Sequence, residues 1–174
     1  VENAACAARL SAMADLLDEL DVVTLGHALS ELAGATIEAA LEIVSREFSD
    51  VPRLAVIALG RWGGEELSYA SDADAMIVID SEDPAATQTA TTLVGRLRTL
   101  LAQPGPDPAL EIDLDLRPEG KGGTMVRTLA SYAKYYATWA STWEAQALLR
   151  AAVGAGDRDL GERFLASVAG IRYP

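Results

Sequence analysis

Residues 54–80 read LAVIALGRWGGEELSYASDADAMIVID, and this stretch decides the fold. Its two apolar runs, LAVIAL at 54–59 and AMIVI at 75–79, are typical of short strands that are buried on both faces. The segment between the runs carries three glycines that indicate a turn: Gly60, Gly63 and Gly64. A short helix can begin at GGEEL, within this turn. The stretch therefore predicts a strand, a turn with a short helix, and a second strand.

Two aspartates, Asp72 and Asp74, stand where the second strand begins. Residues i and i+2 project from the same face of a strand, so we expect the two carboxylates to lie side by side. A later run, ALEIDLDL at 109–116, alternates apolar and acidic residues as a strand with one wet face does. That alternation points three acids to one side: Glu111, Asp113 and Asp115. If the two strands are neighbours, one of these acids completes a three-carboxylate cluster.

Such a cluster is unfavourable unless a cation neutralises it, because like charges a few ångströms apart raise one another's pKa. Oxygen ligands and high charge suit Mg²⁺, which is bound by one or two carboxylates together with nucleotide phosphates. Three carboxylates can hold two metal ions, as in phosphoryl and nucleotidyl transfer. The glycine turn favours this interpretation, because amides without a neighbouring Cβ approach phosphate oxygens closely. The alternative is an acidic strand edge that simply faces water.

The rest of the chain is predicted to be largely helical. Apolar residues recur at helical spacing in several segments: 2–19, 21–48 (one or two helices), 82–102, 128–152 and 158–169. The long helix predicted over 128–152 carries aromatic residues that we expect in the core: Tyr132, Tyr136, Trp139 and Trp143. A loop is expected at QPGPDP, residues 103–108. The order of elements predicts an α+β fold, with a helical lead-in over 1–50 and a core with C-terminal helices over 51–174, as part of a longer protein.

The composition excludes several classes of function. The 174 residues include 26 acids against 14 lysines and arginines, and the resulting net charge of −12 argues against nucleic acid as a partner. Cys6 and His27 are single residues of their types, which excludes an internal disulfide, a cysteine zinc site and histidine-dependent triads. No apolar run approaches the roughly 20 residues of a membrane span, and no signal peptide is visible, so we expect a cytoplasmic protein. Because histidine and cysteine are so scarce, we expect any chemistry to depend on carboxylates and a hard cation.

Three motifs together resemble a known family: GRWGGEELSYASDAD at 60–74, IDLDLRPEGKGG at 112–123 and TWEAQALLRA at 142–151. They are similar to those of bacterial glutamine synthetase adenylyltransferases, members of the DNA polymerase β-like nucleotidyltransferase superfamily. The resemblance implies a polymerase β-like core, a small mixed sheet with flanking helices, plus helices at both ends. It also implies that full-length members carry two such catalytic domains. One attaches AMP from ATP to a tyrosine of glutamine synthetase, and the other removes it by phosphorolysis.

The residues of these motifs look more like those of the C-terminal, adenylylating half of the family's proteins. The resemblance then implies magnesium-dependent transfer of AMP from ATP to glutamine synthetase. It further implies a nitrogen-signal regulatory protein that acts through the full-length protein. Within the family the alternatives are the deadenylylating half and a catalytically silent nucleotide-binding regulatory domain. Outside it, the alternative is another nucleotidyltransferase, one that modifies an antibiotic or a nucleic acid.

The resemblance also implies roles for individual residues. Asp72, Asp74 and Asp113 are the implied metal ligands and catalytic residues, and Asp113 is the candidate that helps to deprotonate the acceptor tyrosine. The nucleotide-binding residues would be Gly60, Arg61, Gly63, Gly64, Ser71, Arg117 and Lys121. Arg61 stands where the superfamily carries serine, so it would contact phosphate by charge rather than by a hydroxyl group.

For some residues a structural role is an open alternative. Arg117 can form a salt bridge within the fold instead of contacting phosphate, and Ser71 can cap the entrance of the strand. Glu144 and Arg150 fall within the third motif and are expected to anchor helices through polar contacts. Asp115 stands where members of the family often carry arginine, so it is given no role as a ligand.

Overall fold

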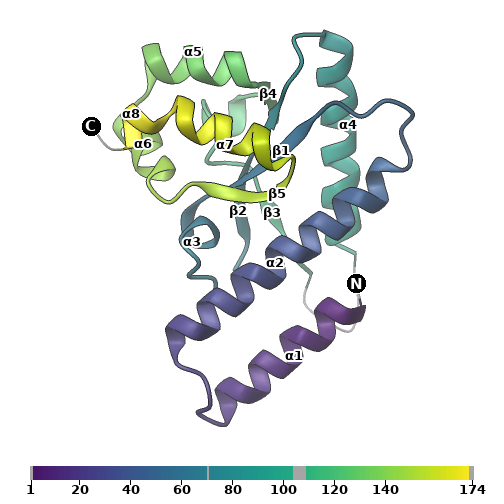
Figure 1. Ribbon diagram of the computed structural model, residues 1–174, viewed down its shortest axis with the longest axis vertical. Helices are drawn as coiled ribbons and strands as arrows, with labels where there is room; N and C mark the ends of the chain where they lie inside the picture. Colours follow the sequence, from purple (N-terminus) through teal and green to yellow (C-terminus); the bar gives the residue numbers. More distant parts are fainter. Residues whose placement is uncertain (1, 70, 104–108, 173–174) are drawn as a thin grey trace.

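The computed structural model describes residues 2–69, 71–103 and 109–172 (Figure 1). The helices are α1 (Glu2–Leu16), α2 (Val22–Ser45), α3 (Gly60–Gly63), α4 (Pro84–Leu101), α5 (Leu129–Trp139), α6 (Thr142–Leu148), α7 (Arg158–Ser167) and α8 (Ala169–Arg172). The strands are β1 (Leu54–Ala58), β2 (Ala73–Ile79), β3 (Ile112–Asp113), β4 (Val126–Thr128) and β5 (Ala152–Gly156). A 3₁₀ turn spans Gly120–Gly122. The elements form an open mixed sheet with helices around it, which confirms the α+β class.

The described strands form a sheet in the order β3-β2-β1-β5. The central strand β1 is antiparallel to both β2 and β5. The other side of β2 pairs in parallel with β3 at the start of the strand and with β4 at its end. Every residue of β1 is buried, as predicted for a strand covered on both faces. The register places Asp74 directly opposite Asp113, so the two acidic strands are neighbours.

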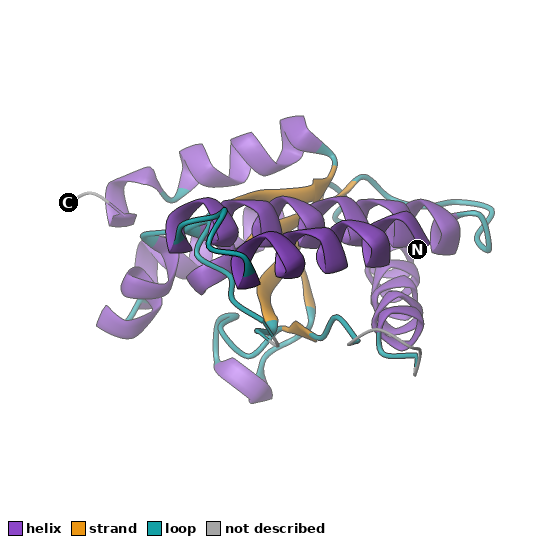
Figure 2. Ribbon diagram, turned by 90° about the horizontal axis from the view of Figure 1, so that it is seen from below, coloured by secondary structure: helices purple, strands orange, loops and turns teal. Residues whose placement is uncertain are grey.

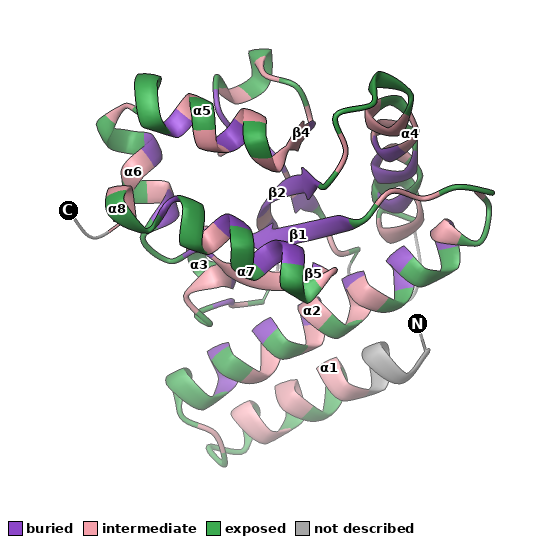
Figure 3. Cartoon of the chain, turned by 45° about the horizontal axis from the view of Figure 1, so that its top comes forward, coloured by how far each residue is buried: buried purple, intermediate pink, exposed green. Residues whose placement is uncertain are grey.

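Alternate residues of β1 and β2 point into two separate hydrophobic clusters, as the period of a strand requires. On one face, Val56 and Ile77 pack with side chains from α2 and α4. On the other face, Ile57 and Met76 pack with side chains from α5, α6 and α7. Figures 2 and 3 show the strands at the centre of the molecule, with helices around them. The sheet is therefore held rigidly between two helical layers.

The N-terminal region begins with a helical hairpin. Residues 22–45 form the single helix α2, which begins at the N-cap Asp21, whose side chain accepts the backbone N–H of Thr24. Ile37, near the middle of α2, is fully buried against the sheet. Helix α1 packs on α2 (Figure 1), and it ends at Leu16 rather than at residue 19 as predicted. The second helix of the lead-in is thus part of the same core as the strands.

The prediction of one long helix over 128–152 is wrong. The segment contains α5, then α6, and finally the start of β5. Ser141 and Glu144 form a capping box, in which each side chain bonds the other's backbone, so a new helix begins there. The break also turns two aromatic side chains outward: Trp139 is 72% exposed and Trp143 45%. Tyr132 and Tyr136 are buried as predicted, and the two tryptophans are not part of the core.

Two shorter elements also differ from the prediction. The strand expected over 109–116 is limited to Ile112–Asp113. It ends because Oδ1 of Asp113 accepts the backbone N–H of Asp115 at 2.7 Å, which bends the chain into a turn. The helix expected at GGEEL is instead α3, which starts at Gly60 and ends at Gly63. At the other end of the chain, α7 ends at Ser167 and is followed by α8. From residue 104 onward, the loop predicted at 103–108 lies outside the described residues.

Candidate metal centre

Three carboxylates meet where β2 and β3 run side by side. Asp72 and Asp74 flank the first residue of β2, and Asp113 is the last residue of β3. Each contributes an oxygen that lies within 4.8 Å of the other two. The side chain of Asp72 is exposed, whereas those of Asp74 and Asp113 are half-buried. The parallel pairing of Asp74 with Asp113 explains why acids 39 positions apart in the sequence converge.

The electrostatics of the cluster favour a bound cation. Burial raises the pKa of Asp74, and the neighbouring charges of Asp72 and Asp113 raise it further. None of the ion pairs found among the described residues joins an arginine or lysine to any of the three carboxylates. A set of hard oxygen donors that carries excess negative charge matches what Mg²⁺ binds. The residues therefore fit a divalent metal ion.

Gly60 brings the turn directly against the cluster. Its φ angle is +52°, and a Cβ atom at this position would lie only 2.3 Å from Oδ2 of Asp74. The backbone also connects the two elements, because the N–H of Leu59 donates to the carbonyl of Asp74 at 2.9 Å. Both the left-handed backbone and the missing side chain are thus required here. The short helix α3 begins at this glycine, beside the carboxylates.

The other glycines of the turn face a different neighbour. A Cβ atom on Gly63 would lie 2.2 Å from the carbonyl oxygen of Arg150, and one on Gly64 would lie 2.9 Å from the Arg150 side chain. The turn is anchored further by Trp62, whose buried indole N–H donates to the carbonyl of Ser30 in α2 at 3.2 Å. Arg61 is exposed, and its Nε donates to the carbonyl of Glu66. Close packing of this kind fixes the position of the whole turn.

Ser71 shapes the loop that leads into β2. Its hydroxyl lies 2.9 Å from that of Ser68 and accepts the Ser68 backbone N–H at 3.2 Å. On α2, His27 lies 2.6 Å from Glu65 of the glycine turn. These contacts tie the approach to the aspartates to the turn and to α2.

Arg117 and Lys121 lie beyond β3, next to Asp115. The guanidinium of Arg117 is buried and donates to the carbonyls of Leu114, Lys121 and Gly123. It also lies 3.5 Å from Asp115, so Arg117 forms the salt bridge that is the alternative to a phosphate contact. Lys121 is exposed, with Nζ 3.2 Å from Asp115. Arg117 thus supports the loop that carries Asp115, whereas the Lys121 ammonium faces solvent.

The third motif anchors helices, as expected. Glu144 is 2% exposed and accepts the N–H and hydroxyl of Ser141 and the hydroxyl of Tyr135. These hydrogen bonds lower the pKa of Glu144 against the opposing effect of burial. Arg150 forms an ion pair with Glu66, just after the glycine turn. The motif therefore connects the C-terminal helices to the turn.

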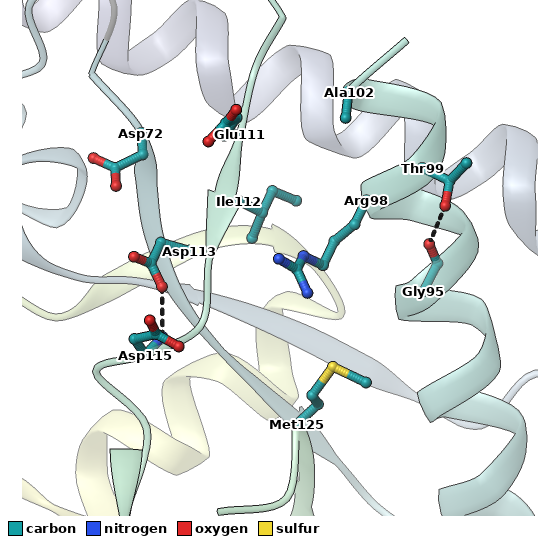
Figure 4. Close-up of a pocket in the computed structure, with 10 residues that line it drawn as sticks. All are labelled: Asp72, Gly95, Arg98, Thr99, Ala102, Glu111, Ile112, Asp113, Asp115 and Met125. Carbon is teal, nitrogen blue, oxygen red and sulfur yellow. Dashed lines mark hydrogen bonds between the residues drawn. The ribbon is translucent and has the colours of Figure 1, made fainter. Parts of the chain in front are cut away.

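A cavity of about 540 Å³ opens on the far side of β3, between this strand and α4 (Figure 4). Asp72, Glu111, Asp113 and Asp115 contribute an acidic wall, and α4 contributes Arg98. Arg98 cannot be identified from the sequence, because a polar residue on an amphipathic helix gives no signal of what it faces. Only the packing of α4 beside β3 brings it to the carboxylates.

Comparisons with known proteins agree with the geometry. A family described as Glutamate-ammonia ligase adenylyltransferase matches residues 4–167. A protein of Cutibacterium acnes, named Bifunctional glutamine synthetase adenylyltransferase/adenylyl-removing enzyme, is 53% identical over 162 residues, which cover 93% of this chain and 16% of that protein. Proteins of the same name from Mycolicibacterium smegmatis and Mycobacterium tuberculosis are each 48% identical, over 94% and 92% of this chain and 17% of their own lengths. The chain thus spans a small part of these relatives. In the described part of the chain, no helix combines the length and apolar character needed to cross a membrane.

Proposed function

Because this chain belongs to the glutamate-ammonia ligase adenylyltransferase family, we propose that it transfers AMP from ATP to a tyrosine of glutamine synthetase, with release of pyrophosphate. The observation that carries the proposal is the convergence of three carboxylates beside the Gly60 turn. With a single histidine and a single cysteine, the sequence cannot form a multi-histidine or cysteine metal site. We therefore assign the reaction to the carboxylates and a metal ion.

The three aspartates would hold the metal. Asp72, Asp74 and Asp113 supply the oxygen donors, and magnesium bound there neutralises charge on the attacking and leaving oxygens. Gly60 keeps the turn close to Asp74, so that phosphates on this side of the cluster lie beside the backbone of α3. The remaining residues of the proposed nucleotide site are Arg61, Gly63, Gly64, Ser71, Arg117 and Lys121. Arg61 is an exposed cation of the turn and can approach the triphosphate directly, whereas Arg117 and Lys121, which lie beyond β3 next to Asp115, would act through the loop that Arg117 supports.

In the proposed reaction, the tyrosine oxygen attacks the α-phosphorus of ATP in line. A bond between oxygen and phosphorus forms while the bond to the bridging oxygen breaks, and pyrophosphate leaves with the electron pair. Asp113 accepts the proton of the tyrosine hydroxyl. The Asp115 N–H holds Oδ1 of Asp113 at 2.7 Å, which fixes the orientation of the carboxylate toward the substrates.

The same site also suits the removal of AMP from the tyrosine, which is a separate reaction. The relatives' names include an adenylyl-removing activity as well as adenylyl transfer. Phosphorolysis would use phosphate as the nucleophile and release the tyrosine and ADP. This is the second candidate function, because both reactions pass through the same exchange at phosphorus. We place either reaction in the cytoplasm, with glutamine synthetase and ATP as partners and a nitrogen-signal regulatory protein acting through the full-length protein.

The test is a transfer assay with α-labelled ATP, Mg²⁺ and unmodified glutamine synthetase, beside an Asp74→Asn variant. Label that moves to glutamine synthetase only with the unsubstituted protein supports adenylylation at this site. Phosphate-dependent release of AMP as ADP from modified glutamine synthetase, without forward transfer, supports the reverse function. If neither reaction occurs although magnesium-dependent ATP binding persists, both candidate functions are wrong and the silent nucleotide-binding domain is favoured.

A further inference from the structure

The cavity between β3 and α4 touches the metal centre from one side only. Its lining includes Asp72 and Asp113, but neither Asp74 nor any residue of the Gly60–Gly64 turn. The sheet order explains this separation, because the turn follows β1, β2 lies in the middle, and β3 forms the edge beside the cavity. The turn and the cavity therefore lie on opposite sides of the carboxylates.

In an in-line transfer, the attacking and leaving oxygens lie on opposite sides of the phosphorus. If the triphosphate lies beside the turn, as in the proposed function, the acceptor oxygen must come from the other side. The cavity is the space on that side, and Asp113, the residue that accepts the acceptor's proton, lies in its wall. We propose that this cavity is the acceptor subsite, which receives a tyrosine side chain of the protein substrate, and that Arg98 positions it. This inference rests on the proposed function.

The lining suits a tyrosine better than a nucleotide. Ile112, Met125 and Ala102 give the cavity apolar surface against which an aromatic ring can pack. Glu111 is a further carboxylate of the wall that has no ion pair among the described residues, and it disfavours a triphosphate but tolerates a neutral phenol. A volume of about 540 Å³ falls in the range of clefts that bind small molecules, so a tyrosine side chain has room to enter.

Arg98 is the cation that faces this cavity from α4. In Figure 4 its guanidinium extends from α4 toward Ile112 and Asp113. No ion pair or hydrogen bond of its side chain occurs among the described residues, although carboxylates line the same cavity. Arg96, two positions earlier on the same helix, is instead paired with Glu47 at 3.0 Å. An unpaired planar guanidinium at the mouth of an acidic cavity can stack on the ring of an incoming tyrosine.

The experiment compares Arg98→Ala with Arg96→Ala, a matched control on the same helix. AMP transfer is measured with glutamine synthetase varied at saturating ATP, and with ATP varied at saturating glutamine synthetase. We expect Arg98→Ala to raise the KM for glutamine synthetase roughly tenfold and to leave the KM for ATP unchanged. Arg98→Lys keeps the charge in the last turn of α4 but not the planar group, so it should give an intermediate KM. Arg96→Ala should match the unsubstituted protein in both constants.

Other results would overturn the proposal. A higher KM for ATP in Arg98→Ala would mean that the cavity holds the nucleotide, and unchanged constants would mean that Arg98 positions nothing. If the unsubstituted protein runs only the phosphorolytic reaction, the same shift should appear in the KM for adenylylated glutamine synthetase. The two proposals fail in different ways. If the proposed function is wrong, the unsubstituted protein transfers no AMP. If only this inference is wrong, the unsubstituted protein transfers AMP and Arg98→Ala does not raise the KM for glutamine synthetase.

Discussion

Aspartates lie at both ends of the central strands, without ion-pair partners in the described structure at one end and paired with arginines at the other. One end carries the three aspartates of the proposed metal centre, which form no ion pair among the described residues. At the other end, aspartates are interleaved with arginines: Asp80, Asp157, Asp159, Arg53 and Arg163. Arg53 lies 2.6 Å from Asp157 and 2.9 Å from Asp159, while Arg163 lies 2.7 Å from Asp80. The contrast separates acids that form ion pairs within the fold from acids that are available to the proposed metal ion.

At the end where aspartates pair with arginines, each aspartate has a partner within the protein. Asp157 accepts two of the three hydrogen bonds that Arg53 donates, and it also caps α7 by accepting the N–H of Leu160. Its pKa is lowered from 3.8 to about 2, mainly by the hydrogen bond from Arg53. At the other end, burial and like charges raise the pKa of Asp74. Ionised Asp157 therefore favours the folded state, whereas ionised Asp74 opposes it until a cation binds.

The largest expected effect is at the metal centre. If Asp74 is a metal ligand as proposed, Asp74→Asn should lower AMP transfer by more than about 100-fold, because the metal would stabilise charge at the phosphate. The same substitution should raise the melting temperature in the absence of metal, since it removes one of the repelling charges. Transfer rates and thermal melts with chelator measure the two effects. A variant that is both inactive and clearly less stable would show that Asp74 is structural, as the residues at the other end are.

Gly60→Ala tests the fit of the turn against Asp74. The new Cβ would lie 2.3 Å from Oδ2 of Asp74, on a backbone with φ of +52°, so the carboxylate or the turn must move. A displacement of about 1 Å can lower transfer by roughly 100-fold, and the left-handed backbone costs about 1–2 kcal/mol of stability. Gly170→Ala is the control, because a Cβ there has nothing within 4 Å. Equal activity of the two variants would contradict the assigned geometry.

Metal binding should stabilise only the unpaired end. At a Mg²⁺ concentration of about 100 times Kd, binding to the folded state contributes about 2.7 kcal/mol. For a chain of this size, each kcal/mol raises the melting temperature by about 2–4 °C. Melts with and without Mg²⁺ should therefore differ by roughly 5–10 °C for the unsubstituted protein and for Asp157→Asn, but not for Asp74→Asn. A Mg²⁺ shift that persists in Asp74→Asn would place the ion elsewhere.

The sequence predicted the parts of this molecule that short patterns determine. Two apolar runs gave β1 and β2, and the i, i+2 spacing placed Asp72 beside Asp74 before any partner strand was known. Asp113 joins these acids only because β3 pairs with β2. The alternation of acidic and apolar residues over 109–116 predicted a strand there, but not which strand it pairs with. The resemblance to a family supplied the choice of Asp113 over its neighbours.

Sequence patterns gave wrong or no predictions where capping or contacts between distant segments determine the structure. Helical spacing over 128–152 hid the break at Ser141, because the capping box depends on one serine and one glutamate within an otherwise helical run. β5 was missed because AVGAG has no strand pattern, yet it pairs with β1 and fits beside Trp62 through Gly154. The cavity residue Arg98 and the Arg53 network each join segments that are distant in the sequence, and no local pattern encodes such contacts.

The smallest expected effect separates charge from capping at the paired end. Asp157→Asn keeps a side chain that caps α7 equally well, so any loss of stability reports the missing charge opposite Arg53. Because both partners are partly exposed, we expect the melting temperature at pH 7 to fall by only about 1–3 °C.

The pH dependence of the melting temperature shows whether the charge of each aspartate stabilises or destabilises the fold. The folded pKa of Asp157 is about 2 against an ordinary 3.8, so its contribution is complete above 3.8 and is lost as the pH falls from 3.8 toward 2. The difference in melting temperature between Asp157→Asn and the unsubstituted protein should therefore vanish across that window. Asp74→Asn should behave in the opposite sense, because the raised pKa of Asp74 means that its charge destabilises the fold at neutral pH and is neutralised as the pH falls. If both substitutions shift stability in the same direction at pH 7, the two ends of the sheet do not differ in the way that their ion pairs indicate.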